Sequence, residues 1–212
     1  MRPWQQYLMS KCPRDSFRSM PEWARSQSAQ WRYADYEAFE QDTMVCFGAI
    51  AATCLSMVYK PVTIVEMGVF SGHTSLLLCR ANPEARVHGV DLNSCMPGTT
   101  LGVGYTAMLH GVKNLSLHIG NSWEFSMPGK VDLCFIDADH CGDAPYKDTL
   151  RAWENRNTKG DWCIAWDDYH PSNPDVTRAV DRFVSEVGME LHKIASWFYI
   201  GTKPHSAVEA FT

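Results

Sequence analysis

The segment Leu133–His140 reads LCFIDADH, and the segment Ile164–His170 reads IAWDDYH. In each, a run of apolar residues ends abruptly in carboxylates, which is typical of a buried parallel strand whose last residues enter a crevice at the end of a sheet. Because neighbouring strands lie about 4.8 Å apart, four carboxylates and a histidine are expected to converge. Clustered negative charges repel one another, so the two segments predict a bound cation, a bound substrate, or both.

Strand-like and helix-like segments alternate around these two clusters. The seven predicted strands cover residues 63–67, 86–90, 115–119, 131–136, 162–166, 191–195 and 197–200. Alternation of this kind predicts an α/β fold with a doubly wound, mostly parallel sheet. The last two strands are joined tightly, so we expect an antiparallel edge near the C-terminus.

The helix after the fifth predicted strand has the clearest sequence signal. Apolar residues recur with i, i+3, i+4, i+7 spacing from Val176 to Val187, which gives the helix one apolar face. Asn173 is a plausible N-cap, Pro174 fits the first helical position, and Gly188 fits a terminator. The sequence therefore predicts a helix between Asn173 and Gly188 that packs against the sheet.

The chain is interpreted as a single domain over residues 1–212. Residues 44–212 form the predicted core, beginning with a buried helix in the apolar stretch Met44 to Tyr59. Residues 1–43 carry three tryptophans without a clear period, and we interpret them as a helical cap over the sheet. Alternatively, the same residues form an oligomer contact, in which case the protein would be a homo-oligomer.

Composition excludes several kinds of partner. The net charge of −5 and the lack of a dense Lys/Arg run argue against nucleic acid and against an anionic membrane surface. The N-terminus lacks the apolar core of a signal peptide. None of the eight cysteines forms a C-x-x-C pair. Since Cys134 and Cys163 fall inside predicted central strands, we expect reduced thiols and a cytoplasmic protein.

A glycine-bearing turn follows the first predicted strand and reads EMGVFSGHT over Glu66–Thr74. In a dinucleotide-binding G-x-G-x-x-G turn, the second glycine lets the backbone approach a pyrophosphate. Phe70 stands at that position and would hinder a diphosphate, although it would not hinder a phosphate-free adenosine derivative. Asp91 ends the second strand nineteen residues after Gly72, where an acid can accept hydrogen bonds from ribose hydroxyls. Together these features favour S-adenosylmethionine (SAM) over NAD.

Five motifs carry a resemblance to a known family. They are VEMGVFSGHTS at residues 65–75, VD at 90–91, GNS at 120–122, FIDADH at 135–140 and WDDY at 166–169. On these motifs the chain resembles the class I SAM-dependent methyltransferases, which have a seven-stranded Rossmann-like fold. It is most similar to the metal-dependent O-methyltransferases, a group that includes catechol, caffeoyl-CoA and macrolide-sugar enzymes. The resemblance covers roughly residues 45–202.

The resemblance implies a set of site residues. The cofactor SAM would be bound by Glu66, Gly68, Phe70, Ser71, Gly72, Thr74, Asp91, Asn121, Ser122 and Trp123. A divalent metal, normally Mg²⁺ with Mn²⁺ as the alternative, would be held by Asp137, Asp167 and Asp168. His140 occupies the position of the general base in the sugar-modifying relatives. Many relatives carry an acid where this chain has Asn121, which leaves recognition of the adenine amino group open.

The residue types at the predicted site fit metal-assisted methyl transfer, and they also allow simpler interpretations. A hard cation lowers the pKa of a coordinated hydroxyl, and a histidine accepts the released proton near neutral pH. Alternatively, Asp137 and Asp139 cap the following helix, Asp167 and Asp168 are solvated turn residues, and Trp123 merely fills the core.

The expected function is Mg²⁺-dependent O-methylation of a hydroxyl on a small molecule, either a sugar or a phenolic natural product. Two alternatives are a tailoring enzyme of the same fold that hydroxylates its substrate and a nonenzymatic nucleoside-binding module.

Overall fold

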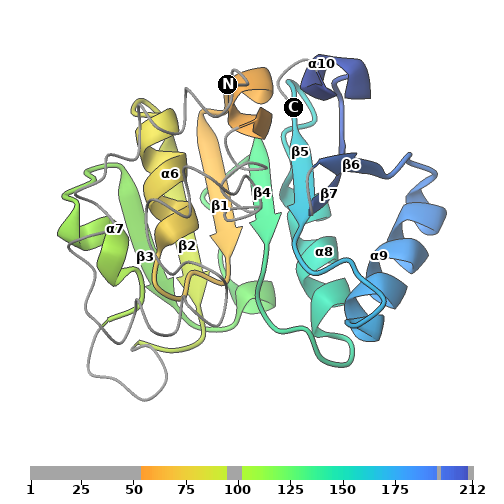
Figure 1. Cartoon of the computed structure of the whole chain (residues 1–212), viewed down its shortest axis with the longest axis horizontal. Helices are drawn as coiled ribbons and strands as arrows, with labels where there is room; N and C mark the ends of the chain where they lie inside the picture. Colours follow the sequence, from red (N-terminus) through yellow and green to blue (C-terminus); the bar gives the residue numbers. More distant parts are fainter. Residues whose placement is uncertain (1–53, 95–101, 195–196, 210–212) are drawn as a thin grey trace, which may run out of the picture.

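The described part of the computed structural model, residues 54–94, 102–194 and 197–209, contains one seven-stranded sheet. Its strand order is β3-β2-β1-β4-β5-β7-β6 (Figure 1). The strands are β1 (Thr63–Met67), β2 (Arg86–Asp91), β3 (Leu115–Ile119), β4 (Leu133–Ile136), β5 (Cys163–Trp166), β6 (His192–Ile194) and β7 (Trp197–Gly201). Strands β1 to β5 pair in parallel, whereas β7 runs antiparallel to both β5 and β6. The predicted α/β fold is confirmed, while the predicted cap over residues 1–43 lies outside the described residues.

Helices cover both faces of this sheet. They are α6 (His73–Ala81), α7 (Tyr105–Leu109), the 3₁₀ turn η1 (Ser122–Glu124), α8 (Ala144–Asn155), α9 (Pro174–Val187) and α10 (His205–Glu209). Residues 54–59 are also helical and belong to the predicted buried helix. Among the described helices, none is both long and apolar enough to cross a membrane.

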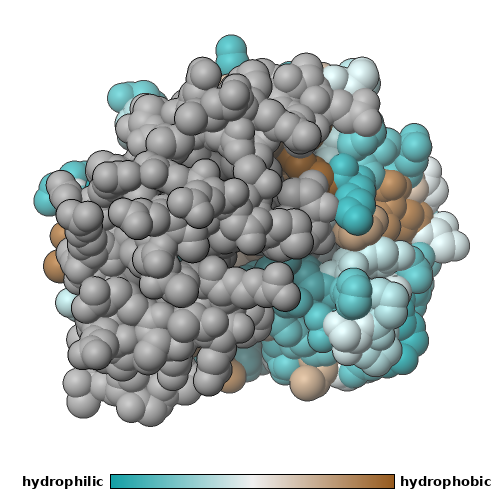
Figure 2. Space-filling model, viewed as in Figure 1, coloured by the Kyte–Doolittle hydropathy of each residue, from teal (hydrophilic) through white to brown (hydrophobic). Residues whose placement is uncertain are grey.

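Successive side chains of the central strands enter two separate apolar clusters. On β1, Ile64 packs with residues of α6 and of the 54–59 helix, whereas Val65 packs with residues of α8 and α9. All five residues of β1 are buried, as expected for a parallel strand covered on both faces. On the face seen in Figure 2, the described surface is mainly hydrophilic with smaller hydrophobic areas. The core therefore lies on both faces of the sheet, and the ends of the strands remain available to form a site.

The strand register aligns the carboxyl ends of β1, β4 and β5. Met67 lies opposite Ile136, and Ile136 lies opposite Trp166. The residues immediately after these three, Gly68, Asp137 and Asp167, therefore leave the sheet side by side. This register brings the glycine turn and both acidic clusters to one edge.

At the opposite end of the strands, the half-buried Asp132 ties β1 to β4. Its Oδ2 accepts hydrogen bonds from the backbone N–H groups of Val62 and Thr63, each at 2.8 Å. Its Oδ1 accepts a hydrogen bond from Nδ2 of Asn157 at 2.7 Å. All three bonds involve a charged acceptor, which makes each stronger than a neutral bond.

Asp132→Ala is expected to lower the free energy of unfolding by about 2–4 kcal/mol, because it leaves three donors unpaired. Urea denaturation measures the change. Asp161→Ala is the matched control, since Asp161 forms a surface ion pair with Lys203 at 2.6 Å and such pairs contribute about 1 kcal/mol or less. Equal losses in the two variants would contradict a special role for Asp132.

Candidate active site

The turn after β1 depends on two glycines with positive φ. Gly68 has φ of 87°, and a Cβ placed on it would lie 1.9 Å from the backbone oxygen of Asp137. Gly72 has φ of 83°, and its Cβ would lie 2.7 Å from Cα of Gly104. Only glycine tolerates both the conformation and the close approach. The turn is thereby pressed against the end of β4 and against the segment that precedes α7.

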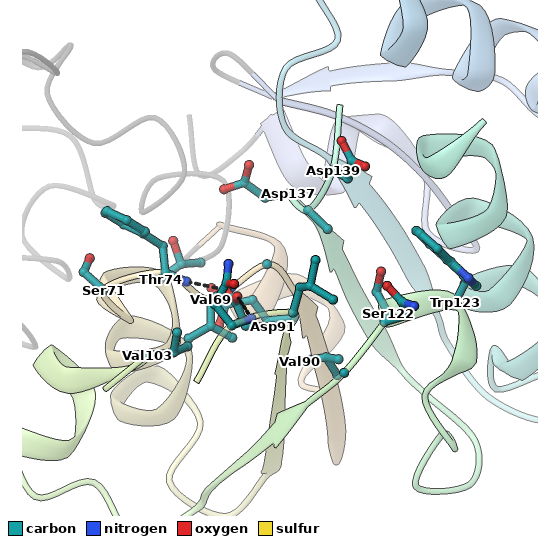
Figure 3. A pocket seen from close by; sticks show the side chains of 18 of the residues that line it. Val69, Ser71, Thr74, Val90, Asp91, Val103, Ser122, Trp123, Asp137 and Asp139 are labelled. Carbon is teal, nitrogen blue, oxygen red and sulfur yellow. Dashed lines mark hydrogen bonds between the residues drawn. The ribbon is translucent and has the colours of Figure 1, made fainter. Parts of the chain in front are cut away.

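The carboxylate of Asp91 holds this turn in place. Its Oδ2 accepts hydrogen bonds from the backbone N–H groups of Val69 at 3.0 Å and Phe70 at 2.9 Å (Figure 3). Its Oδ1 accepts one from the N–H of Asn93 at 3.0 Å. A carboxylate offers about four acceptor positions, so Asp91 keeps capacity for a ribose hydroxyl. The sequence predicted only the ribose role and missed the bracing of the turn.

A cavity of about 390 Å³ opens above the carboxyl ends of β1, β2 and β4. Its volume lies in the range of small-molecule sites. It is lined by every predicted cofactor residue except Gly72, which acts in the turn itself, and also by Asp137. The lining residues that sequence reasoning missed include Leu92, Asn93, Val103 and Ala138. The two glycines on either side of Val103 are a sequence signal that could have pointed to this segment. In the structure, the Gly104 N–H donates a hydrogen bond to the Phe70 backbone oxygen at 2.8 Å.

The cavity has two distinct ends (Figure 3). Ser71 and Thr74 lie at one end, and Ser122 and Trp123 lie at the other. The ammonium of Lys147 lies 5.1 Å from the centroid of the Trp123 ring, a cation–π distance that helps to hold the ring. Trp123 therefore lines the cavity instead of filling the core.

Glu66 is a buried acid on β1 that lines the cavity, with 3% of its surface exposed. It accepts a hydrogen bond from the Ser75 hydroxyl. Burial raises the pKa of Glu66 to about 8, against the lowering effect of Ser75 and with smaller raising effects of Asp137 and Asp91. In this structure Glu66 is consequently mainly protonated at neutral pH.

Asp137, His140 and Asp168 converge at the edge of the same cavity. The His140 Nε2 atom lies 3.5 Å from Oδ1 of Asp137 and 3.2 Å from Oδ2 of Asp168. One potential ligand atom from each of the three residues lies within 4.8 Å of the others. Burial raises the pKa of Asp137, and the neighbouring Asp137 carboxylate raises the pKa of His140. The two acidic clusters of the sequence thus meet as expected.

Asp167 interacts electrostatically with this cluster. It is not one of the three residues whose ligand atoms converge in the described structure. Burial first, then the charges of Asp137 and Asp168, raise the pKa of Asp167 to about 8. The predicted metal ligands thus include Asp167, whereas the cluster in the structure has His140 in its place beside Asp137 and Asp168.

Asp168 is held in an unusual backbone conformation, with φ of 56°. The Nδ2 atom of Asn173 donates a hydrogen bond to Oδ1 of Asp168 at 3.0 Å. Asn173 occupies the predicted N-cap position of α9, although its side chain makes no capping bond there. Its amide instead orients the acid.

The simpler interpretation of Asp137 and Asp139 as helix caps does not hold. The N-cap position of α8 belongs to Asp143. Asp139 accepts a hydrogen bond from the backbone N–H of Cys141 at 3.0 Å and lines the cavity. Both acids therefore face the site.

The comparisons with known proteins agree with this geometry. Residues 65–169, just under half of the chain, match the family model described as a methyltransferase domain. Comparison with curated protein sequences gives no match. Among solved structures, the O-methyltransferase from Bacillus cereus in complex with SAH has 14% identity and a TM-score of 0.58, with 93% of this chain and 95% of that chain covered.

Two further structures share the fold. The SAH-bound methyltransferase PaMTH1 from Podospora anserina has 15% identity and a TM-score of 0.58, with 96% of this chain and 99% of that chain covered. The O-methyltransferase TomG from Streptomyces achromogenes, in complex with SAM and involved in tomaymycin synthesis, has 16% identity and a TM-score of 0.53. There, 73% of this chain and 78% of that chain are covered.

The sheet topology is that of a Rossmann-like α/β fold, and residues 65–169 resemble a methyltransferase domain. The solved O-methyltransferase structures share this fold.

Proposed function

We propose that this protein is a SAM-dependent, Mg²⁺-assisted O-methyltransferase that acts on a hydroxyl of a small molecule, either a sugar or a phenolic compound. One observation carries the proposal: Asp137 belongs both to the lining of the cavity and to the acidic cluster with His140 and Asp168. A methyl donor in the cavity and an acceptor hydroxyl at the cluster would therefore be neighbours, as an in-line displacement requires.

The donor set of the cluster fits a hard divalent cation. Asp137, Asp167 and Asp168 supply carboxylate oxygens, which suit Mg²⁺ or Mn²⁺ better than Zn²⁺. Burial raises the pKa of Asp137 and of Asp167, and the carboxylates add to this by repelling one another. A cation would favour the ionised form of these acids. When bound, it would lower the pKa of an acceptor hydroxyl.

The chain's own residues supply binding and proton transfer. The turn braced by Asp91 binds the amino-acid and ribose parts of SAM, and the end formed by Ser122 and Trp123 binds the base. His140 accepts the acceptor's proton at Nε2, and Asp137 stabilises the resulting imidazolium, since it raises the pKa of His140. General-base catalysis of this kind contributes about 10²–10⁴-fold.

Calorimetric titration of the full chain with S-adenosylhomocysteine, with and without Mg²⁺, tests the binding part of the proposal. Incubation with SAM and a panel of sugars and phenols, followed by mass analysis, tests the reaction. The expected product gains one methyl group. No cofactor binding under either condition would reject the proposal. A gain of one oxygen would identify hydroxylation, and binding without turnover would favour a nonenzymatic module.

Binding of S-adenosylhomocysteine is expected to release close to one proton at pH 7. Burial raises the pKa of Glu66 to about 8, whereas the ligand's ammonium group, placed beside Glu66, would favour the ionised carboxylate. Calorimetry in buffers with different ionisation heats measures this release. Glu66→Gln should abolish it, while Glu84→Gln, a change of an exposed acid that does not line the cavity, should not. Equal proton release by both variants would contradict this role.

The same shift has a consequence for stability. Because the folded-state pKa of Glu66 lies above its unfolded value of 4.5, folding retains a proton, and stability falls as pH rises from about 4.5 to 8. Glu66→Gln should lose this contribution, so its unfolding temperature should depend less on pH across that interval. A scan of unfolding temperature against pH measures the difference.

A further inference from the structure

Three polar side chains at the start of α9 form hydrogen bonds to residues outside the helix. Asn173 stands at the N-cap position, yet its side chain makes no capping bond there. Asp175 and Thr177 follow at intervals of two residues. An N-cap side chain usually accepts a hydrogen bond from a free N–H group of the first turn and stabilises the helix. Because α9 lacks that contribution, the bonds that its first turn makes elsewhere call for an explanation.

The Asn173 side chain reaches back to the acidic segment that follows β5. Its Nδ2 atom donates a hydrogen bond to Oδ1 of Asp168 at 3.0 Å, and its backbone N–H donates to the backbone oxygen of His170 at 2.8 Å. The Thr177 hydroxyl donates to the same His170 oxygen at 3.0 Å. These bonds hold the segment from Asp168 to His170 against the helix, including the positive φ of Asp168.

The Asp175 carboxylate reaches the other acidic segment, which follows β4. Its Oδ2 atom accepts a hydrogen bond from the backbone N–H of Gly142 at 2.6 Å, and Gly142 comes two residues after His140. The bond from Gly142, and after it the bond from Arg178, lower the pKa of Asp175, so the acceptor is ionised at neutral pH. Hydrogen bonds to an ionised acceptor are roughly twice as strong as neutral ones.

The start of α9 is therefore connected to both halves of the cluster formed by Asp137, His140 and Asp168. Asn173 holds Asp168, and Asp175 holds the segment that carries His140. Both segments leave the sheet at the same end (Figure 1). The apolar face of α9 is buried in the core, and rigid elements hold a site more precisely than loops do. The spacing of the cluster thus depends on a single helical turn.

We propose that the first turn of α9 is a clamp that fixes the spacing of this cluster and makes the cluster selective for a small divalent cation. Asn173 and Asp175 are its positioning residues, and each acts through the segment to which it is bonded. This inference rests on the proposed function, because the cation belongs to that proposal. Mg²⁺ demands near-ideal octahedral geometry at about 2.0–2.1 Å, whereas Ca²⁺ accepts flexible geometry at about 2.3–2.6 Å. Loosening the clamp should therefore weaken Mg²⁺ binding more than Ca²⁺ binding.

Displacement of Mn²⁺ from the full chain by Mg²⁺ and by Ca²⁺ tests the proposal, with free Mn²⁺ measured by electron paramagnetic resonance. Asn173→Ala and Asp175→Ala should each weaken Mg²⁺ binding by about 10–100-fold, the usual effect of removing a residue that orients a metal ligand. Ca²⁺ binding should weaken only about threefold or less, because its coordination adapts. Affinity for S-adenosylhomocysteine should change about twofold or less, because neither residue lines the cavity.

Asp175→Asn is the matched control for charge. It loses the same charge as Asp175→Ala, but its amide oxygen still accepts the Gly142 N–H, so the ratio of Mg²⁺ to Ca²⁺ affinity should stay that of the unaltered protein. Arg178→Ala removes the ion pair with Asp175 and leaves the Gly142 bond, so it should also keep the ratio. Asn155→Ala removes an amide that is bonded to a backbone oxygen within α8, and it serves as the control for Asn173.

A ratio that is unchanged in either alanine variant that folds would overturn the proposal. Equal weakening of Mg²⁺ and Ca²⁺ binding would also overturn it, because a change of charge or a general loss of structure affects both cations alike. Asp175→Ala decides the matter if Asn173→Ala does not fold. Failure of the proposed function looks different, because the unaltered protein would then bind no Mn²⁺, a result that rejects both proposals.

Discussion

Asp168→Asn is expected to reduce kcat/KM for methyl transfer by about 10³-fold or more while affinity for S-adenosylhomocysteine changes only a few-fold. The variant keeps the size of the side chain and tolerates the positive φ at this position, since asparagine adopts it readily. It removes one of the charges that converge with His140 and Asp137. Loss of the cation that these charges would bind removes several kcal/mol of stabilisation from the transition state.

Steady-state kinetics at saturating Mg²⁺, together with calorimetry of cofactor binding, separate the two effects. Asp143→Asn is the matched control, because Asp143 stands at the start of α8 without a side-chain capping bond and outside the cluster. It should leave kcat/KM within about twofold. Full activity of Asp168→Asn would reject the assignment of the cluster to catalysis.

Gly68→Ala is expected to lower the free energy of unfolding by more than about 4 kcal/mol, which is exceptional for a single methyl group. The added Cβ would lie 1.9 Å from the backbone oxygen of Asp137, so the turn and the end of β4 cannot both keep their positions. Folded molecules should also lose cofactor binding, because the same turn lines the cavity. Denaturant titration and calorimetry measure the two losses.

Gly188→Ala provides the matched control. Gly188 also has positive φ, at 66°, but nothing lies within 4 Å of a Cβ placed there. Only the conformational penalty of about 1–2 kcal/mol remains. If Gly68→Ala and Gly188→Ala lower the free energy of unfolding by the same amount, the close approach between the turn and Asp137 is not the reason that position 68 requires glycine.

Much of the fold follows from local sequence patterns. The bounds of β1 and β3 agree with prediction, and α9 begins and ends at the predicted Pro174 and Gly188 signals. The start of β4 differs: Val131 forms an isolated bridge with Arg156, so the regular strand begins at Leu133. Apolar character alone cannot distinguish a residue that pairs within the sheet from one that pairs with a loop.

The site was less predictable, because contacts between side chains depend on the turn conformations that deliver them. The convergence of Asp137 with Asp168 follows from strand order and could be predicted. The hydrogen bonds that Asp91 accepts from the turn and that Asp168 accepts from Asn173 could not be predicted, since each depends on backbone angles that the sequence does not specify.

The placement of β7 inside the sheet has a consequence for synthesis. Since β7 pairs with both β5 and β6, a ribosome-bound chain that ends before Trp197 leaves the Cys163–Trp166 edge without its neighbour. Unpaired strand edges invite association with other chains. A stop codon just before β7 should therefore yield aggregates, even though the predicted metal-binding acids and His140 have already been translated.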